Sequence, residues 1–321
     1  MVPPARILVT GASGFVGRHL LPALRQAYPN ASLLAASQNR DIPSADEIVP
    51  FNLLDTEGMT VLLRAARPDA VVHLAAQASV GDSFRDPDQC WRVNVDGTLA
   101  LARTLLKHLP STLLVFASSA EVFGLSFQQA SPLDERAPMA PANPYAASKA
   151  AIDLALGEMA LRGLRLVRLR MFNQVGPGQS EAFMIPAFSR QIARAEAGLQ
   201  PPVLRVGALD RWRDFIDVRD GCAAFIAGLD RAQALPAGVA INIASGTPRR
   251  VGDILDALTA RSSLSFAIES DPVRLRPTDV ERVAGDAGLA ARLLNWKPRH
   301  CWEQTLDLVL EDWRARVAHE N

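Results

Sequence analysis

The feature that most constrains the fold lies within the first thirty residues. The apolar segment Arg6–Thr10 leads directly into a turn that carries Gly11, Gly14 and Gly17, and a helical pattern follows to about Tyr28. Gly11 permits the tight turn, Gly14 lets a pyrophosphate approach backbone N–H groups at the helix start, and Gly17 lets helix and strand pack closely. A glycine triplet between a strand and a helix predicts a dinucleotide-binding unit.

Strands and helices then alternate along the first half of the chain. We expect a loop at 77–85, one long helix at 88–108, and further apolar strands at 32–36, 48–51, 70–74, 113–117 and 164–170. Such alternation is typical of a parallel sheet with helices on its faces.

The alternation breaks down after residue 172, although 240–244 still has the pattern of a strand and 301–317 that of an amphipathic helix. We therefore predict an α/β protein: a Rossmann-type doubly wound parallel sheet with a smaller mixed α/β C-terminal substrate domain. The dinucleotide-binding domain is assigned to 1–172, with segments near 214–244 returning to it, and the substrate domain mainly to 173–321.

Length and composition bound the class of protein. The chain has 321 residues, 49% of them hydrophobic, which is enough for a large domain and a smaller one. Basic and acidic residues balance at 34 each, so no net field attracts nucleic acid or an anionic membrane. The cysteines, Cys90, Cys222 and Cys301, are too widely spaced for a metal motif and favour reduced thiols. We expect a cytoplasmic protein with no metal site, signal peptide or membrane span.

Residues 143–149 carry chemistry that can be inferred from spacing. Asn143 can cap a helix and Pro144 suits its first turn, so Tyr145 and Lys149 fall four apart on one helical face. A tyrosine pKa of about 10 moves to about 7 with roughly 4 kcal/mol of preferential stabilisation of the phenolate, which a nearby cation can supply. Tyr145 would then donate or accept a proton in carbonyl reduction or alcohol oxidation.

Two further observations bear on this pair. The alternative is that Tyr145 and Lys149 are exposed residues on a surface helix. The chain has only three lysines, so it is improbable that one stands four residues after Tyr145 by chance. Ser119 follows the fifth strand, at the edge where α/β sheets bind ligands, and could hydrogen-bond a substrate oxygen while Tyr145 moves the proton.

The end of the second strand bears on the cofactor. An acidic residue there would select NAD through the ribose 2′-hydroxyl, but the chain has Ser37 and Arg40 instead. Their hydroxyl and guanidinium groups suit a 2′-phosphate, so NADP(H) is favoured over NAD(H). The alternative is that Arg40 is a solvated loop arginine.

Other loops at the same edge complete the candidate cofactor site. Residues after the third strand can flank an adenine, and small residues after the fourth let the backbone approach the cofactor. His73, inside the fourth strand, is interpreted as a buried core residue. The candidate cofactor-binding residues are Gly11, Ser13, Gly14, Phe15, Val16, Gly17, Ser37, Arg40, Asn52, Leu53, Leu74, Ala75, Ala76, Tyr145, Lys149 and Met171.

Four motifs together resemble a known family along essentially the whole chain. These are TGASGFVG at 10–17, SSAEVFG at 118–124, YAASK at 145–149 and RDF at 213–215. The sequence is similar to the extended short-chain dehydrogenase/reductases of the NAD-dependent epimerase/dehydratase type, which act on nucleotide sugars. Segments 172–179, 183–192 and 274–277 most resemble the branch that reduces GDP-linked 4-keto-6-deoxy sugars.

The resemblance implies roles for individual residues. Ser119, Tyr145 and Lys149 would form the catalytic triad, and Glu121 matches the base of related 4,6-dehydratases. Asn173 matches a substrate-contacting asparagine, and Arg213 and Arg276 match arginines that hold the substrate diphosphate. The candidate substrate-binding residues are Ser83, Ser119, Glu121, Asn173, Gln179, Arg213 and Arg276.

The expected reaction follows from the same resemblance. NAD(P)H would reduce the C4 ketone of a nucleotide-activated 4-keto-6-deoxy sugar, with GDP-4-keto-6-deoxy-D-mannose giving GDP-D-rhamnose. The alternative is a redox-neutral 4,6-dehydratase or epimerase, although Ala120 stands where dehydratases commonly have a polar residue. A more distant alternative is a non-catalytic cofactor-sensing protein. A homodimer through the 88–108 helix and the Tyr145 helix is also implied.

Overall fold

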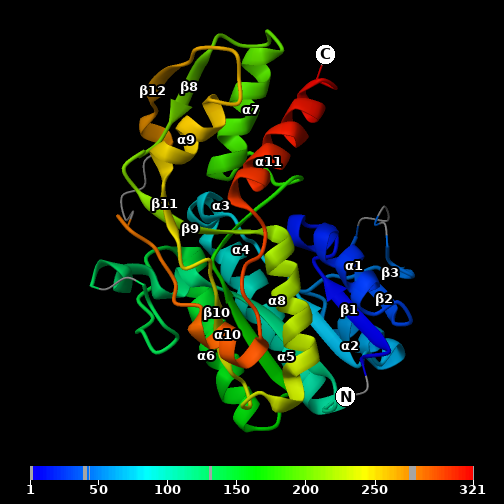
Figure 1. Ribbon diagram of the computed structural model, residues 1–321. Helices are drawn as coiled ribbons and strands as arrows, with labels where there is room; N and C mark the ends of the chain where they lie inside the picture. Colours follow the sequence, from blue (N-terminus) through cyan, green and yellow to red (C-terminus); the bar gives the residue numbers. More distant parts are fainter. Residues whose placement is uncertain (1–2, 39–41, 43, 130–131, 275–279, 321) are drawn as a thin grey trace.

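The structure, a computed structural model, describes residues 3–38, 42, 44–129, 132–274 and 280–320. Within these residues the centre is a parallel sheet of seven strands (Figure 1). The strands are β1 (Arg6–Thr10), β2 (Ser32–Ala36), β3 (Glu47–Val49), β4 (Ala70–His73), β5 (Leu113–Ser119), β6 (Leu166–Met171) and β10 (Ala240–Ile243). Their order is β3-β2-β1-β4-β5-β6-β10, which reverses direction between β1 and β4. Open α/β sheets bind ligands at such a reversal.

Helices cover both faces of the sheet, so most strand side chains are apolar in both directions. In β1, Ile7 and Val9 pack on one face while Leu8 packs on the other. The first face carries α1 (Phe15–Ala27), α8 (Val218–Arg231) and α10 (Gly288–Leu294). The second carries α2 (Thr56–Ala66), α5 (Thr98–His108) and α6 (Pro144–Leu161).

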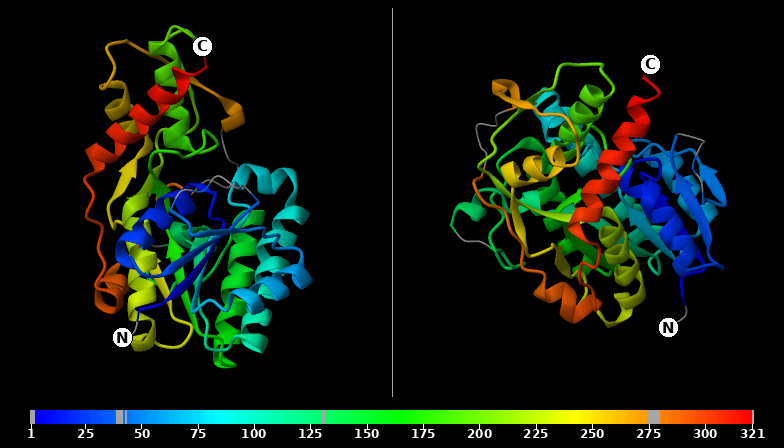
Figure 2. Two further views of the ribbon diagram at one scale, coloured as in Figure 1. Left: turned by 90° about the vertical axis from the view of Figure 1, so that its right-hand side faces the viewer. Right: turned by 45° about the horizontal axis from the view of Figure 1, so that its top comes forward.

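A smaller lobe stands beside the carboxyl edge of the sheet (Figures 1 and 2). Its core lies between α7, α9 and α11 and includes Phe188, Leu255, Leu310 and Trp313. Its helices are α7 (Met184–Glu196), α9 (Val251–Thr259) and α11 (Trp302–Val317). Its strands are β7 (Asn173–Val175), β8 (Val203–Val206), β9 (Trp212–Asp217), β11 (Pro248–Arg250) and β12 (Ala267–Ser270).

The chain passes repeatedly between sheet and lobe. After β9 it returns to the large sheet as α8 and β10, goes back to the lobe as β11 and α9, packs on the sheet again as α10, and ends in the lobe with α11 (Figure 1). The predicted α/β fold with a doubly wound parallel sheet is confirmed. The domain boundary at 172 stays a prediction. Among the described residues, no helix is long and apolar enough to cross a membrane.

Two predictions between residues 77 and 108 are wrong. The expected loop contains a helix, α3 (Val80–Arg85), because the Ser79 hydroxyl caps it by accepting a hydrogen bond from Asp82 N at 3.2 Å. The expected single helix is divided into α4 (Pro87–Trp91), a π-helical turn η1 (Arg92–Gly97) and α5. Within the turn, a Cβ on Gly97 would lie 2.5 Å from Leu53 Cγ, so close packing there requires glycine.

Candidate active site

The glycine turn faces the loop after β4 across the point where the strand order reverses. Gly11 has φ +67°, and a Cβ added there would lie 2.8 Å from Ala75 N. A Cβ on Gly17 would lie 2.5 Å from Gly11 O, so helix α1 can approach the turn only with glycine at this position. The glycine turn therefore packs closely on the loop after β4, and the backbone N–H groups at the start of α1 suit a pyrophosphate.

The end of β2 presents hydroxyl groups toward the glycine turn. Ser37 is buried, and its hydroxyl donates to Ser13 Oγ at 2.9 Å. Arg18, which sequence reasoning missed, donates through Nε to Ser13 O at 2.9 Å. The sequence signal that could have indicated Arg18 as a cofactor-binding residue is its position directly after Gly17, in the exposed first turns of α1. Arg40 lies outside the described residues.

The remaining candidate cofactor residues lie along the same edge. Asn52 Oδ1 accepts from Leu54 N at 3.0 Å, which fixes the turn after β3, and Leu53 is buried against the π-helical turn. His73 is buried between the Thr10 and Thr98 hydroxyls, at 2.7 and 3.0 Å from Nδ1 and Nε2. Desolvation lowers its pKa to about 3, so the interpretation of His73 as a neutral core residue is confirmed.

The predicted start of the helix that carries Tyr145 and Lys149 is confirmed. Asn143 Oδ1 accepts from Ala146 N at 2.7 Å, and Pro144 is the first residue of α6. Lys149, one turn after Tyr145, is 4% exposed, and its ammonium donates to Ala117 O at 2.5 Å and lies 4.3 Å from the centre of the Phe116 ring. Desolvation lowers the pKa of Lys149 to about 8, although the Asp153 charge opposes this shift.

The predicted lowering of the Tyr145 pKa is wrong for this structure. Desolvation, with a smaller contribution from the Glu121 charge, raises the pKa of Tyr145 to about 12, while a hydrogen bond with the Ser119 side chain acts in the opposite direction. Lys149 is not among the causes because its ammonium is directed to β5. At neutral pH the phenol is therefore protonated, the form in which it can donate a proton.

A pocket opens beside Ser119, and its empty volume of about 680 Å³ includes space that is open to solvent. Ser119 is the last residue of β5, and Glu121 follows in the 3₁₀ segment η2 (Ala120–Gln128). Asn143 Nδ2 donates to Glu121 Oε2 at 3.1 Å, so the residue that caps α6 also orients this carboxylate. Ser119, Glu121, Met171, Asn173 and Arg213 all line the pocket.

The pocket also contains residues that sequence reasoning missed. They are mostly apolar side chains that look like ordinary core residues in sequence: Val80, Phe84, Phe127, Phe172, Val280 and Val283. Only the packing of α3, η2 and the segment after residue 279 brings them together.

Two predicted substrate residues, Ser83 and Gln179, are not among the residues that line the pocket. Ser83 is buried and donates to Val80 O at 2.8 Å, and Gln179 is buried and donates through Nε2 to Gln174 O at 3.0 Å. Arg276 lies outside the described residues.

Comparisons with known proteins give a consistent result. The family model described as GDP-mannose 4,6 dehydratase matches residues 8–309. GDP-6-deoxy-D-mannose reductase of Pseudomonas aeruginosa is 36% identical over 98% of this chain and 99% of the relative. A dTDP-glucose 4,6-dehydratase of Streptomyces antibioticus is 31% identical over 97% and 93%. The structure of RMD from Pseudomonas aeruginosa complexed with NADPH has a TM-score of 0.86 and 34% identity, covering 97% of this chain and 99% of that one.

These matches span both the sheet and the lobe, so the likeness is not limited to a shared nucleotide-binding fold. The expected resemblance to the extended short-chain dehydrogenase/reductases, an enzyme family, is confirmed. The chain belongs to the GDP-mannose 4,6 dehydratase family.

Proposed function

We propose that the protein is an NADPH-dependent reductase of a nucleotide-activated 4-keto-6-deoxy sugar, and that it converts GDP-4-keto-6-deoxy-D-mannose to GDP-D-rhamnose. The observation that carries the proposal is a protonated Tyr145 phenol hydrogen-bonded to Ser119, which lines the pocket. The 36% identical GDP-6-deoxy-D-mannose reductase, matched over nearly the whole chain, supports the choice of substrate.

The glycine turn suits a dinucleotide for two reasons. Gly11 lets the turn pack closely on the backbone of Ala75, and Gly14, at the start of α1, leaves the backbone N–H groups there open to a pyrophosphate. Ser13, Ser37 and Arg18 would hold a ribose 2′-phosphate, and the structural neighbour in complex with NADPH supports NADP(H) as the cofactor. When bound, the nicotinamide supplies the hydride.

The side chains of this protein would donate the proton and orient the ketone. Ser119 donates a hydrogen bond to the C4 oxygen, and Tyr145 gives its proton to the alkoxide that forms there. Lys149 holds a positive charge beneath the site and binds the nicotinamide ribose. Asn173 and Arg213 contact the sugar nucleotide, with the guanidinium suited to a diphosphate.

The test is a direct assay. Purified protein should oxidise NADPH when GDP-4-keto-6-deoxy-D-mannose is added and yield a GDP-6-deoxyhexose by chromatography. Tyr145→Phe should lower kcat by about 100-fold or more, because the proton donor is lost. Tyr28→Phe is the matched control: this other tyrosine donates to Asp230 Oδ1 at 2.7 Å in the core, away from the pocket. No oxidation of NADPH or NADH would rule out the reductase.

Cofactor choice can be tested without turnover. We expect Arg18→Ala to weaken NADP⁺ binding on the order of 10- to 100-fold, the value of a lost charge-assisted hydrogen bond, and to leave NAD⁺ binding unchanged. Arg64→Ala, an exposed arginine of α2, is the control. Equal weakening of both cofactors would contradict a 2′-phosphate role for Arg18.

A redox-neutral 4,6-dehydratase is the second candidate, because Glu121 lines the pocket and a dTDP-glucose 4,6-dehydratase is among the relatives. Ala120 also lines the pocket and offers neither acid nor hydroxyl to expel a C6 oxygen, which favours the reductase. Conversion of GDP-mannose without added reduced cofactor would support the dehydratase instead.

We also propose that the protein is a cytoplasmic homodimer that pairs through α4, α5 and α6. Leu154 and Leu161 are 61% and 83% exposed and lie two turns apart on α6, and Trp91 of α4 is 42% exposed. Light scattering at micromolar concentration should give the mass of two chains, and Leu161→Glu should give one. Val61→Glu, at a 65% exposed position on α2, is the control.

A further inference from the structure

Strand β6 carries two arginines where a strand of a covered parallel sheet is expected to be apolar throughout. Arg168 and Arg170 alternate with Val167, Leu169 and Met171, which pack toward α8. Both guanidinium groups point to the opposite face, toward α6, and the Arg170 residue is only 5% exposed. Two positive charges therefore lie inside the layer between the sheet and the catalytic helix.

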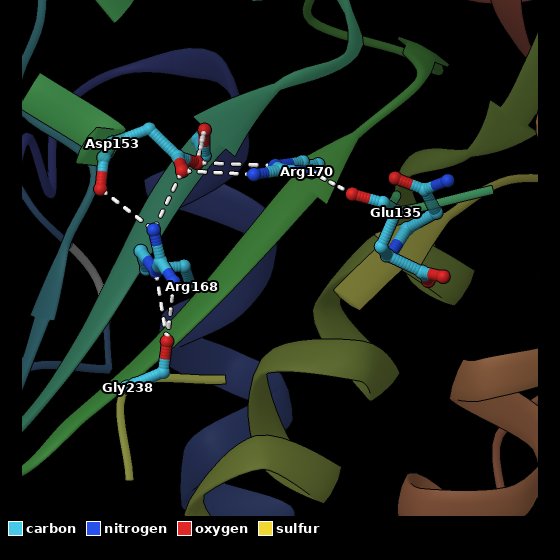
Figure 3. A network of polar contacts seen from close by, with 7 residues as sticks. Glu135, Asp153, Arg168, Arg170 and Gly238 are labelled. Atoms are coloured by element: carbon cyan, nitrogen blue, oxygen red, sulfur yellow. Dashed lines mark hydrogen bonds and ion pairs between the residues drawn. The ribbon is translucent and has the colours of Figure 1, made fainter. Parts of the chain in front are cut away.

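A single carboxylate compensates both arginines (Figure 3). Asp153 of α6 has no exposed surface. Its Oδ1 accepts from Arg168 Nη1 at 2.8 Å and from Arg170 Nη2 at 3.0 Å, and its Oδ2 accepts from Ser118 Oγ at 2.6 Å. Burial alone would raise the pKa of Asp153, but Arg170, Arg168 and Ser118 together hold it below its usual value.

The place of Asp153 on α6 is what links this network to the active site. It follows Tyr145 by eight residues and Lys149 by four, so all three lie on one face of the helix. Its partner Ser118 is the neighbour of Ser119, and its partner Arg170 is the neighbour of Met171. One carboxylate therefore joins the ends of β5 and β6 to the helix that carries the proton donor.

The two arginines face opposite ends of the layer. Arg168 donates to Gly238 O at 2.9 and 2.6 Å, away from the pocket, and an added Cβ on Gly157 would lie 2.7 Å from its Nη1. Arg170 instead donates to Glu135 O at 3.0 Å and lies 5.2 Å from the ring of Phe123, in the η2 segment beside the pocket. Arg170 thus belongs to the site end of the network and Arg168 to the far end.

Lys149 lies at the site end as well. The titratable groups that act on it are Asp153 on its own helix, Cys90 on α4 and His73 on β4. His73 is neutral at physiological pH and Cys90 is a buried thiol. Asp153 is the larger of the two charges that oppose desolvation of the Lys149 ammonium, and Cys90 adds a smaller contribution in the same direction.

We propose that Asp153 is a positioning residue of the reductase: through Ser118 and Arg170 it fixes Ser119 against Tyr145, and its charge maintains the ammonium form of Lys149. Only the part of this inference that concerns kcat rests on the proposed function. It assigns to Asp153 no contact with substrate or cofactor.

The kinetic test compares two buried aspartates. Asp153→Asn keeps the shape and removes the charge, and we expect kcat to fall on the order of 10- to 100-fold, the effect of a small misplacement of catalytic groups, while KM changes by less than about threefold. The alkaline limb of the pH–rate profile should move to lower pH. Asp153→Glu, which retains the charge, should recover part of kcat.

The matched control for this test is Asp220→Asn. Asp220 is 3% exposed and accepts hydrogen bonds from Arg299 N and His300 N at 3.0 and 3.2 Å, away from Tyr145. A merely structural role of Asp153 predicts that both Asn variants lose stability yet keep kcat and the pH profile. That result would overturn the proposal.

A second readout does not require turnover. The chain has three lysines, Lys107, Lys149 and Lys297, so ¹³C-labelled lysine gives side-chain signals that can be titrated separately by NMR. Lys149 should titrate with a pKa of about 8 in the wild type, lower in Asp153→Asn and unchanged in Asp220→Asn. An unchanged value in Asp153→Asn would overturn the electrostatic role. If the wild-type protein had no reductase activity, the proposed function would be contradicted. The titration of Lys149 would still decide whether Asp153 has the electrostatic role.

If Asp153→Asn does not fold, the arginines decide the question. Arg170→Lys and Arg168→Lys both keep the positive charge and lose the planar fork of donors. Because Arg170 lies at the site end, its variant should lower kcat by about 10-fold more than the Arg168 variant at similar stability. Equal kcat in the two variants would overturn the positioning role.

Discussion

Two aspartates with no exposed surface, Asp153 in helix α6 and Asp214 at the junction with the lobe, are satisfied in different ways. Asp153 binds two guanidinium groups and one hydroxyl. Among the described residues, the donors to Asp214 are neutral: Ser245 N at 2.8 Å, Ser245 Oγ at 2.6 Å, Gly246 N at 3.0 Å and Gly285 N at 3.1 Å. The pKa of Asp153 is held down, whereas burial raises the pKa of Asp214.

The difference shows that equal burial does not imply an equal role. Asp153 joins side chains of three elements and carries a charge that its partners need. Asp214 joins backbone segments, namely the loop after β10 and the segment around Gly285, to strand β9. Arg213, which lines the pocket, is the neighbour of Asp214 in β9. Under the proposed function, Asp214 would therefore hold the substrate side of the site and Asp153 the side of the proton donor.

The largest effect is expected from Asp153→Ala. Two guanidinium groups would remain buried without a counter-charge, so the free energy of unfolding should fall by about 3–5 kcal/mol in urea denaturation. Asp82→Ala, which removes an exposed partner of Arg85, should change it by about 0.5 kcal/mol or less. A loss for Asp153→Ala no larger than for Asp82→Ala would show that the network is not needed for stability.

A smaller loss is expected from Asp214→Asn. The amide group would face backbone N–H donors that then lack an acceptor, so the free energy of unfolding should fall by about 1–3 kcal/mol. KM for the sugar nucleotide should rise because the loops beside Arg213 loosen, while the titration of Lys149 stays unchanged. Ser245→Ala, which removes a single donor, should cost less than Asp214→Asn; the reverse order would contradict the assignment of Asp214 as the common acceptor.

Gly157→Ala tests the far end of the Asp153 network. Alanine in place of a helical glycine ordinarily stabilises a protein by about 0.5–1 kcal/mol. Here the added Cβ would lie 2.7 Å from Nη1 of Arg168, and the guanidinium group is held by Asp153 through Nη1 and by Gly238 through Nε and Nη2. We therefore expect a loss of about 1–2 kcal/mol instead. Gly81→Ala in α3, whose Cβ would meet no atom closer than 3.8 Å, is the control and should not destabilise. Thermal unfolding of both variants distinguishes the two outcomes.

The smallest effect is a difference in the sign of pH dependence. The pKa of Asp153 is lower in the folded protein than in the unfolded one. Its carboxylate therefore contributes fully to the free energy of unfolding above the unfolded pKa of about 3.8, and this contribution is lost as pH falls below that value. The raised pKa of Asp214 means that the folded protein binds the proton first, so the wild type gains stability as pH falls toward 3.8.

Urea unfolding at several pH values between about 3 and 6 checks this prediction. As the pH falls, the difference in free energy of unfolding between the wild type and Asp153→Asn should shrink, and the difference between the wild type and Asp214→Asn should grow. Each difference should change by at most about 1.4 kcal/mol per pH unit. If both differences moved in the same direction, the contrast between the two carboxylates would be wrong.

Much of the fold was predictable because its signals are local. The glycine turn needs a positive φ and an absent Cβ, the Asn143 cap needs only its own helix, and buried parallel strands appear as apolar runs. The errors came where local and tertiary preferences compete. The Ser79 cap creates α3 inside an expected loop, and the packing of Gly97 on Leu53 accompanies a π-helical turn inside an expected continuous helix.

For the site, the sequence by itself determined which chemical groups are present: the glycine turn, Ser119, Tyr145, Lys149 and the absence of an acid after β2. Only the tertiary structure decided their electrostatic state, because the pKa of Tyr145 depends on burial and on where the Lys149 ammonium points. The same holds for Asp153, Arg168 and Arg170, which in sequence are ordinary charged residues. Burial and charge pairing are properties of distances between segments far apart in the chain, and local sequence patterns do not specify those distances.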